Sequence, residues 1–408
     1  MGPTACFKRE HNNVFDPETT IKQLNLYVSV ISFEKRVELN WGIPDQQHFD
    51  AFRVYRKGEG ESEFTLLAEL PATRLYYNDT TAIYNSTYYY YLTIKSGINE
   101  SKPSETVSIT PGPGYNWILD RWGYQLIQTT YDTKHLIKQY NLDWPPSDFA
   151  LARDKNIIII TYVLGSLIEK IDTKNNLRIE AYYDAPRPDA VVYDSTGQTF
   201  WIADTTGSII KTGVDASGFQ MIDNTLSKPL WLSVAENSGI VSVVDIKKKM
   251  IIQYNRNGER IGEISRVNSK PLSGPEKFII DERYGRIWLV DGDSTRDVLY
   301  SKHTEESQYI KIDSLDNIGD ICLSPNDDSI YLVHLDGNFS QVLQLFPSGK
   351  RQVVVDNLYY PLSIAINSYD NSLCIADTYN SQVKHYDNEQ NIIGILSNLV
   401  FPLKVIIE

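Results

Sequence analysis

Histidine is the side chain that most metal sites and many nucleophilic sites would use, so the histidines are the first candidates for chemistry. No two of them lie at a spacing that makes a metal-binding pair, and we therefore expect structural roles for them. His334 occupies the position at which related segments carry an aspartate, and its side chain could point toward a central channel. We favour the interpretation that it is a structural histidine whose ring nitrogens are hydrogen-bonded within the protein. The six are His11, His48, His135, His303, His334 and His385.

A carboxylate recurs at the end of a short apolar segment at five places, which are Asp120, Asp204, Asp245, Asp291 and Asp377. A carboxylate at a strand end can accept hydrogen bonds from the backbone amides of the following turn. The functional alternative is a ring of acids near one mouth of the fold that binds a cation. We favour the structural interpretation, because a repeated backbone requirement explains the recurrence without a ligand.

Other motifs for catalysis or metal binding are missing from the sequence. It contains no Gly-x-Ser-x-Gly elbow, phosphate loop or paired-cysteine zinc motif. The stretch from Asp291 to Asp297 spaces oxygens like a calcium loop, but an EF-hand would need Gly at position 296 and Glu at 302, where this chain has Arg296 and Lys302. Cys322 and Cys374 lie among apolar neighbours and are expected to be buried thiols. We therefore assign no catalytic residue, metal ligand or cofactor.

The recurrent carboxylates belong to a repeat of the whole second part of the chain. Positions 120, 161, 204, 245, 291, 334 and 377 are equivalent, with Thr161 and His334 as degenerate copies, and they are 41 to 46 residues apart. This period is that of four-stranded propeller blades. Each repeat has a Pro-led apolar strand, a polar turn and a short second strand. Seven equivalent positions predict seven blades.

The last eight residues, 401–408, copy the Pro-led strand at 360–367. The earliest second strand, Trp117 to Asp120, has no Pro-led strand before it. We therefore predict that the C-terminal strand pairs with this segment and closes a ring, which would remove two apolar ends from water.

The phrase Ile375, Ala376, Asp377, Thr378, Tyr379, Asn380, with Gln382 and Val383 after it, resembles the blade motif of NHL-repeat propellers, as does the segment from Ile202 to Thr205. The resemblance implies an NHL-like β-propeller over residues 115–408. That family more often has six blades, so six is the alternative count.

Residues 21–110 resemble a fibronectin type III domain, in which short strands form a β-sandwich. The resemblance rests on Trp41, on the Tyr-rich segment from Tyr88 to Ile94, and on the exit turn of Glu100, Ser101, Pro103 and Ser104. It implies a corner hydrogen bond from one tyrosine of the late strand, and Tyr88 is our choice because it places Tyr90, Leu92 and Ile94 on one face. Residues 111–114 form the linker.

Composition agrees with an all-β protein of two domains. Of the 408 residues 27 are tyrosine, and no long segment has sustained helical periodicity. The net charge of −13 opposes binding to nucleic acid, and no run of about 18 apolar residues could span a membrane.

The N-terminus, Thr4, Ala5 and Cys6, resembles a processed bacterial lipobox. The resemblance implies a lipid on Cys6, a polar tether over residues 1–20 and a lipid-anchored place at the bacterial cell envelope or cell surface, with a secreted protein as the alternative location. The alternative is an ordinary cytosolic start.

Function is best sought where the repeats differ. Loops after second strands and before first strands open on one face of a propeller, and here they are rich in aromatic residues with mixed charge. They hold Trp122, Tyr124, Tyr162, Arg187, Tyr359, Tyr360 and Tyr379 as predicted ligand-binding residues, with Arg121, Trp144, Lys228 and Trp231 nearby.

Two classes of function remain. The favoured one is a noncatalytic extracytoplasmic recognition or scaffold protein that binds a protein or a glycan, as one member of a larger surface assembly. The alternative is a metal-dependent propeller lyase or hydrolase, which would need inward His, Glu or Asn side chains from several blades.

Overall fold

The computed structural model describes residues 15, 28–33, 36–42, 49–83, 86–109, 115–134, 136–181, 185–216, 218–292, 295–336, 339–368 and 370–408. Its contacts divide the chain into two compact units, Met1–Tyr115 and Asn116–Glu408. Cys6, most of the predicted tether and the linker at 111–114 lie outside the described residues. In the described part no helix is long and apolar enough to cross a membrane.

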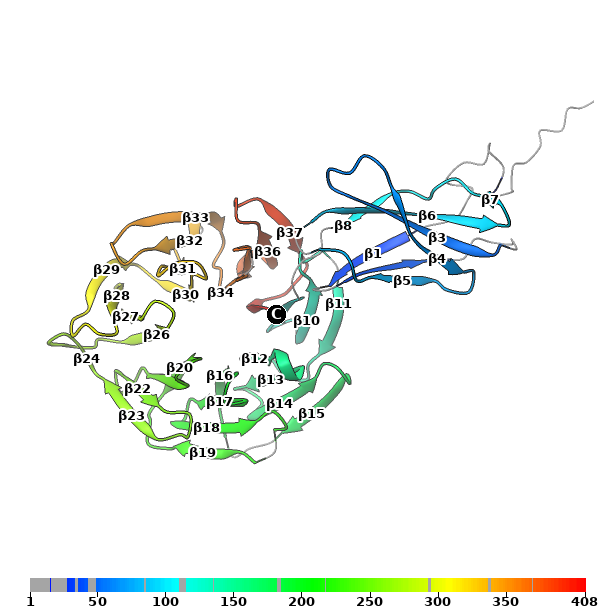
Figure 1. The fold of residues 1–408 in the computed structure, drawn as a ribbon. Coiled ribbons are helices and arrows are strands. Elements are labelled where there is room, and N and C mark those ends of the chain that lie inside the picture. Colours follow the sequence, from blue (N-terminus) through cyan, green and yellow to red (C-terminus); the bar gives the residue numbers. More distant parts are fainter. Residues whose placement is uncertain are drawn as a thin grey trace, which may run out of the picture. The chain divides into compact units, whose positions relative to one another are not determined.

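The described residues of the first unit form two antiparallel sheets (Figure 1). The three-stranded sheet contains β1 (Val28–Phe33), β2 (Arg36–Trp41) and β5 (Tyr76–Asp79). The five-stranded sheet contains β3 (Ala51–Gly58), β4 (Thr65–Pro71), β6 (Tyr88–Ser96), β7 (Asn99–Glu100) and β8 (Val107–Ile109).

Both sheets of the first unit contribute to one apolar core. Leu39 and Trp41 of β2 pack in the same cluster as Phe52 of β3 and Tyr90 of β6. The alternation of buried and half-buried residues along β2 is that of a strand with one face against a core. The two sheets therefore form a sandwich.

The tyrosine-rich strand β6 places its side chains as the sequence predicts. Tyr90, Leu92 and Ile94 are all buried. The hydroxyl of Tyr88 accepts a hydrogen bond of 3.0 Å from the backbone N–H of Ile83. The exit turn continues the pairing, since the hydroxyl of Ser104 accepts from the Leu92 amide at 3.0 Å.

The second unit contains seven four-stranded antiparallel sheets among its described residues, arranged in a ring (Figure 1). In each sheet the first strand listed here is innermost. We number the sheets in order around the ring. Sheet 1 contains β38 (Pro402–Ile407), β9 (Tyr115–Asp120), β10 (Gln125–Thr130) and β11 (Leu136–Asn141), and sheet 2 contains β12 (Asp148–Ala152), β13 (Ile157–Tyr162), β14 (Leu167–Asp172) and β15 (Leu177–Ala181). Sheet 3 contains β16 (Pro188–Asp194), β17 (Thr199–Asp204), β18 (Ser208–Gly213) and β19 (Gln220–Asp223), and sheet 4 contains β20 (Pro229–Ala235), β21 (Ile240–Asp245), β22 (Met250–Tyr254) and β23 (Arg260–Ile264).

The remaining three sheets follow in the same order. Sheet 5 contains β26 (Pro275–Asp281), β27 (Arg286–Gly292), β28 (Asp297–His303) and β29 (Ile310–Leu315). Sheet 6 contains β30 (Ile318–Leu323), β31 (Ile330–His334), β32 (Ser340–Leu345) and β33 (Arg351–Leu358), and sheet 7 contains β34 (Ser363–Ile366), β35 (Leu373–Asp377), β36 (Gln382–Tyr386) and β37 (Ile392–Leu396).

A few short elements complete the second unit. They are the hairpin of β24 (Arg266–Val267) with β25 (Lys270–Pro271), and the 3₁₀ turns η1 (Arg153–Lys155) and η3 (Thr378–Asn380). The sheets hold together because each second strand is covered on both faces by its neighbours. In β13, for example, all six residues from Ile157 to Tyr162 are buried.

The C-terminal strand completes sheet 1. β38 pairs antiparallel with β9, with Val405 opposite Ile118 and Ile407 opposite Asn116. Val405 and Ile407 also pack against Cys374 of sheet 7. The pairing predicted from the sequence repeat is confirmed, and it joins the two ends of the second unit.

Among the described residues the free cysteines are Cys322 and Cys374, and no disulfide joins them. Burial raises the pKa of the Cys374 thiol to about 12, so this side chain is a neutral core residue at neutral pH. The expectation of a buried thiol is confirmed for Cys374, while Cys322 is half-buried on β30.

His385 of β36 is the most enclosed of the described histidines. It has no exposed surface, its Nε2 lies 3.0 Å from the hydroxyl of Ser372, and the ring of Tyr131 packs against it edge to face at 4.8 Å. Burial lowers the pKa of His385 from 6.5 to about 4. The expected structural role is confirmed for this histidine.

The buried imidazole should make folding stability depend on pH. The unfolded chain binds a proton at His385 below about pH 6.5, whereas the folded chain does not until about pH 4, so stability falls as the pH drops through this window, by about 3 kcal/mol in total. Urea denaturation at pH 7.0, 5.5 and 4.0 should show the stability difference between the wild type and His385→Gln narrowing by that amount. A difference that stays constant with pH would contradict the prediction.

Candidate functional site

The recurrent aspartates are occupied by backbone amides. Asp245 is buried and accepts hydrogen bonds from the amides of Ser227 at 2.6 Å and Lys228 at 3.0 Å, which precede β20, and from those of Lys247 and Lys248 at 3.2 and 3.0 Å, which follow β21. The predicted bonds to amides of the following turn are confirmed for Asp120, Asp204 and Asp245. The carboxylate also fastens the loop before the innermost strand, which sequence analysis did not predict. We call Asp120, Asp204, Asp245, Asp291 and Asp377 the clamp aspartates, because each accepts at least one amide from that loop.

The two degenerate repeats use other contacts. In sheet 6, where His334 takes the clamp position, Asp297 of the preceding sheet accepts the amide of Ile318 at 2.6 Å. The Nε2 of His334 is buried with no hydrogen-bond partner among the described residues. In sheet 2 the backbone oxygen of Thr161 accepts the amide of Ser147 at 2.8 Å. Asp291 and Asp297 of the calcium-like stretch thus both bind backbone amides.

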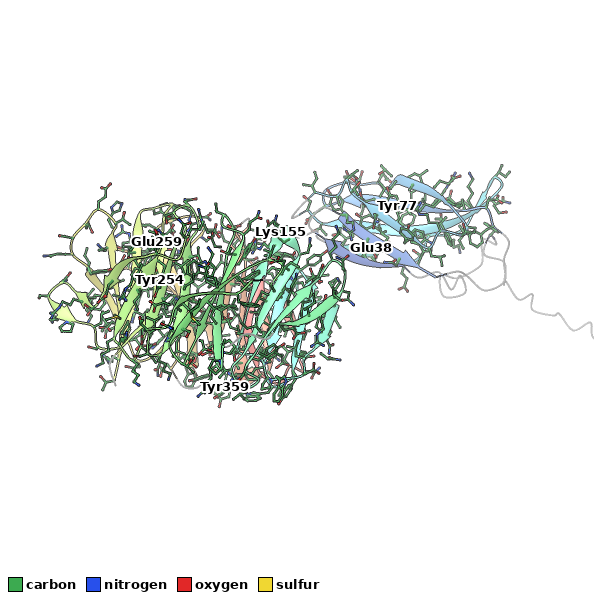
Figure 2. The ribbon with its side chains drawn as sticks, turned by 90° about the horizontal axis from the view of Figure 1, so that it is seen from below. Glu38, Tyr77, Lys155, Tyr254, Glu259 and Tyr359 are labelled. Atoms are coloured by element: carbon green, nitrogen blue, oxygen red, sulfur yellow. The ribbon has the colours of Figure 1, made fainter. Side chains whose placement is uncertain are left out.

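Three tyrosines stack at the end of sheet 7. The rings of Tyr360 and Tyr379 lie parallel with centroids 4.7 Å apart, and Tyr359 meets Tyr379 edge to face at 5.3 Å. Their exposed fractions are 38% for Tyr359, 37% for Tyr360 and 50% for Tyr379. Figure 2 shows Tyr359 at one face of the second unit, with Lys155 and Glu259 at the opposite face.

The loops that carry these rings are held by a clamp aspartate. Asp377 accepts the amide of Tyr359 at 2.7 Å, and the amide of Tyr379 donates to the Tyr359 carbonyl at 3.1 Å. Tyr360 has a φ of +51°, a left-handed conformation that is strained for a bulky residue. The stack is therefore fixed before any ligand arrives, at a local cost in backbone energy.

The tyrosine stack continues toward sheet 1. Phe401 lies 6.2 Å from Tyr379, and its carbonyl accepts the amide of Arg121 at 2.9 Å. The Arg121 guanidinium lies 5.2 Å from the ring centroid of Trp122, which is 43% exposed. We call Arg121, Trp122, Tyr359, Tyr360, Tyr379 and Phe401 together the aromatic face.

Two further predicted ligand-binding residues are exposed but are not part of this contact chain. Tyr124 follows β9, with its backbone in the left-handed region at φ +53°, and Arg187 precedes β16. The backbone amide of Arg187 is bound by the clamp aspartate Asp204 at 2.8 Å, so its loop is fixed while its side chain is free to reach solvent.

The placement of Tyr162 on this surface is wrong. Its side chain is 1% exposed, and its hydroxyl donates a hydrogen bond to Glu169, which is itself paired with Arg178. Tyr162 lies in the core of sheet 2, because β13 extends one residue beyond the clamp position.

Sequence analysis missed Phe401 as a site residue, because it was counted only as the first residue of the closing strand. The signal was available: Tyr360 and Phe401 both precede the proline of a Pro-led strand, so an aromatic ring occupies the same position in two adjacent repeats.

A cavity of about 270 Å³ lies at the centre of the ring, and the innermost strand of each of the seven described sheets contributes to its lining. Two of its charges form an ion pair, Lys404 with Asp148, and Asp148 also accepts the amide of Val191 at 2.9 Å. Trp231 lines the cavity from β20. In the described ranges no group of three or more His, Cys, Asp or Glu is placed to hold a metal ion.

Comparisons with known proteins identify the fold. No family model matches the sequence, and no curated protein matches it. Among solved structures of the propeller type, a functionally unknown protein from Desulfotomaculum acetoxidans is 12% identical, with a TM-score of 0.57 over 72% of this chain and 98% of its own. A "putative 6-phosphogluconolactonase" from Bacteroides fragilis is also 12% identical, with a TM-score of 0.54 over 71% of this chain and 97% of its own. At this identity the likeness shows the fold alone, and that fold is a β-propeller.

Proposed function

We propose that this protein is a noncatalytic recognition protein that binds a protein or a glycan through the aromatic face. The observation that carries the proposal is the stack of Tyr359, Tyr360 and Tyr379, whose rings are ordered against one another and yet remain 37 to 50% exposed. Stacking of exposed rings on a strained loop is more than the fold requires, because the clamp aspartate already holds the backbone.

The aromatic face has the composition of a binding hot spot. Large flat side chains bring much contact area at a low cost in conformational entropy, and arginine beside tryptophan adds a charged donor. Since the rings already contact one another, little rotamer freedom would be lost on binding. Either a protein surface or the apolar face of a sugar ring would fit such a site.

The proposal includes the finer architecture. We assign seven blades, supported by seven four-stranded sheets that share one central cavity, with a strand motif like that of NHL repeats. The sandwich over residues 21–110 is assigned as fibronectin type III-like, with Tyr88 in the corner role. A lipid on Cys6 and the tether at 1–20 would hold the protein at the bacterial cell surface, as a spacer or as part of a larger assembly.

The central cavity is where the alternative, a metal-dependent lyase or hydrolase, would work. Of its three carboxylates, Asp148 and Asp320 are engaged by backbone amides, and Asp148 also by Lys404, which leaves Asp189. A single carboxylate without protein partners is too few ligands for a catalytic metal ion. This observation favours recognition over metal-dependent catalysis.

Replacing Trp122 and Tyr379 together with Ala should lower the affinity for the partner at least a hundredfold, because two central aromatic contacts of about 2 kcal/mol each would be lost. Thermal stability should change little, since both side chains are 43 to 50% exposed. Full-length protein would be tested against a glycan array and against solubilised envelope proteins, with binding measured by surface plasmon resonance.

The matched control is Tyr284→Ala, which removes a tyrosine that is 38% exposed and lies outside the aromatic face. A second variant, Tyr360→Gly, relieves the left-handed backbone and should weaken binding without lowering the melting temperature. Equal binding by the wild type and the double variant would exclude this face.

A further inference from the structure

Most charges in the central cavity have protein partners. Asp148 pairs with Lys404 and accepts the amides of Phe149 at 2.8 Å and Val191 at 2.9 Å. Asp320 accepts the amides of Ile321 at 2.9 Å and Ile364 at 3.0 Å. The second amide in each case belongs to the next sheet of the ring, so these two carboxylates tie neighbouring innermost strands together. Their role is accounted for by the fold.

Two charges of opposite sign remain. Within the described part of the chain, the carboxylate of Asp189 and the ammonium of Lys277 have no hydrogen bond and no ion pair, although both line the cavity. Burial raises the pKa of Asp189 and Asp148 raises it further, against the opposing effect of Arg121, Arg187 and Lys228. Burial lowers the pKa of Lys277, against the opposing effect of Asp320 and Glu276. Each charge is therefore costly as it stands.

An aromatic residue lies on the innermost strand between the two strands that carry the unpaired charges. Asp189 lies on β16, Trp231 on β20 and Lys277 on β26, which are the innermost strands of three consecutive sheets. The Nζ of Lys277 lies 4.6 Å from the ring centroid of Trp231. The cavity thus offers an anion, an apolar surface and a cation in sequence.

A second cavity adjoins the first. Trp231 and Lys277 also line a space of about 500 Å³ together with Ser273, Gly274 and Glu276, which lie in or next to the loop before β26. Because this loop is held by a clamp aspartate, Asp291, it belongs to the same side of the ring as the other clamped loops. A small molecule can therefore reach Lys277 from either of the two adjacent cavities.

We propose that the central cavity binds a small zwitterion, a molecule with one amine and one carboxylate. Its ammonium group pairs with Asp189, its carboxylate pairs with Lys277, and the carbon chain between them lies against Trp231. A simple cation or a simple anion would satisfy only one of the two charges and leave the other unpaired. At about 270 Å³ the cavity is at the lower end of the usual size of ligand pockets, which suits a free amino acid rather than a polymer.

The test uses full-length protein and isothermal titration with glycine, 4-aminobutanoate and 6-aminohexanoate, a series that varies the separation of the two charges. Hexanoate and hexylamine carry one charge each and serve as matched ligands. The best zwitterion should bind at least tenfold more tightly than either, since each charge-assisted contact contributes about tenfold or more.

Variants of Lys277 and Asp189 show which residue binds each charged end of the ligand. Lys277→Met should remove the preference for 6-aminohexanoate over hexylamine, and Asp189→Asn should remove the preference over hexanoate. Lys277→Arg keeps the positive charge and should retain binding. Lys270→Met and Asp336→Asn alter exposed residues outside the cavity and should behave as the wild type.

Three outcomes overturn the proposal: no zwitterion binds at millimolar concentration, the single-charge ligands bind equally well, or the two cavity variants bind like the wild type. Thermal melting of each variant shows whether it is folded. If one cavity variant fails to fold, the single-charge ligands still decide the question on the wild-type protein.

Discussion

Deleting residues 401–408 should abolish the native fold of the second unit. Those residues contain β38, which supplies the innermost strand of sheet 1 and pairs with β9. Without it, Trp117, Ile118 and Leu119, which are all buried, would lose the strand that covers their edge. The expected product is an aggregated or partly folded protein, not a slightly less stable one.

The size of the effect follows from what β38 contacts. Burial of its four aliphatic side chains, Leu403, Val405, Ile406 and Ile407, is worth about 1.5 to 3 kcal/mol each when complete. The strand also contributes the ion pair of Lys404 with Asp148, and the hydroxyl of Thr378 donates to its Pro402 carbonyl at 2.8 Å. The sum, on the order of 5 to 10 kcal/mol, is comparable with the whole stability of a domain.

Size-exclusion chromatography and urea denaturation would measure the loss, and a synthetic peptide of residues 401–408 added in trans should restore part of it. Val405→Asp places one charge in the buried face of β38 and should approach the effect of the deletion. Ile395→Asp makes a similar change on β37 at a side chain that is 42% exposed, and should cost little. A truncated protein with unchanged cooperative unfolding would refute the role of the closing strand.

The closing strand could be predicted from sequence because a similar segment occurs earlier in the chain. Residues 360–367 include the same Pro-led pattern, and a repeat that lacks this strand has one obvious partner. The clamp aspartates could be predicted for a related reason, since a residue type that recurs at one strand end implies a recurrent backbone contact. Both predictions came from comparing repeats within the chain, and the preferences of single residues for strand or turn would not have given them.

Positions that face the cavity could not be read from alternation along the strands. In five of the innermost strands the pairing register shifts near the first residue, as it does between Pro188 and Ala190 in β16 and between Pro275 and Lys277 in β26. Such a bulge resets which residues point to each face. Sequence alternation therefore gave no basis for placing Asp189 and Lys277 together.

The aromatic face was predicted as a set of residues but not as a structure. Tyr359, Tyr360 and Tyr379 come from two separate loops, and their stacking depends on how Asp377 positions both. Tyr162 failed for the opposite reason: β13 is buried along its whole length, so no alternation distinguishes an exposed end from a core position. Loop geometry and complete burial both lie beyond what residue types can indicate.

Removal of a clamp carboxylate should be the most damaging single polar substitution in the second unit. Asp245→Ala leaves the amides of Ser227, Lys228, Lys247 and Lys248 without their acceptor. We expect a loss of about 2 to 4 kcal/mol, because a buried acceptor that serves several donors is replaced by a methyl group while some of the freed amides regain water.

Two comparisons separate the clamp from an ordinary turn contact. Asp245→Asn keeps one acceptor oxygen and should cost about half as much as Asp245→Ala. Asp387→Ala also removes a carboxylate that accepts two backbone amides, from Glu389 and Asn391, and the side-chain amide of Asn391. All three donors belong to its own exposed turn, so the expected cost is about 1 kcal/mol or less. Urea denaturation of the three variants against the wild type gives the free energies. If Asp245→Ala and Asp387→Ala lose equal stability, the contact with the loop before the innermost strand adds nothing to the free energy of unfolding. A larger loss at Asp245 means that the recurrent aspartate holds each innermost strand to the neighbouring strand. The loops of the aromatic face then owe their fixed geometry to the same contact at Asp377.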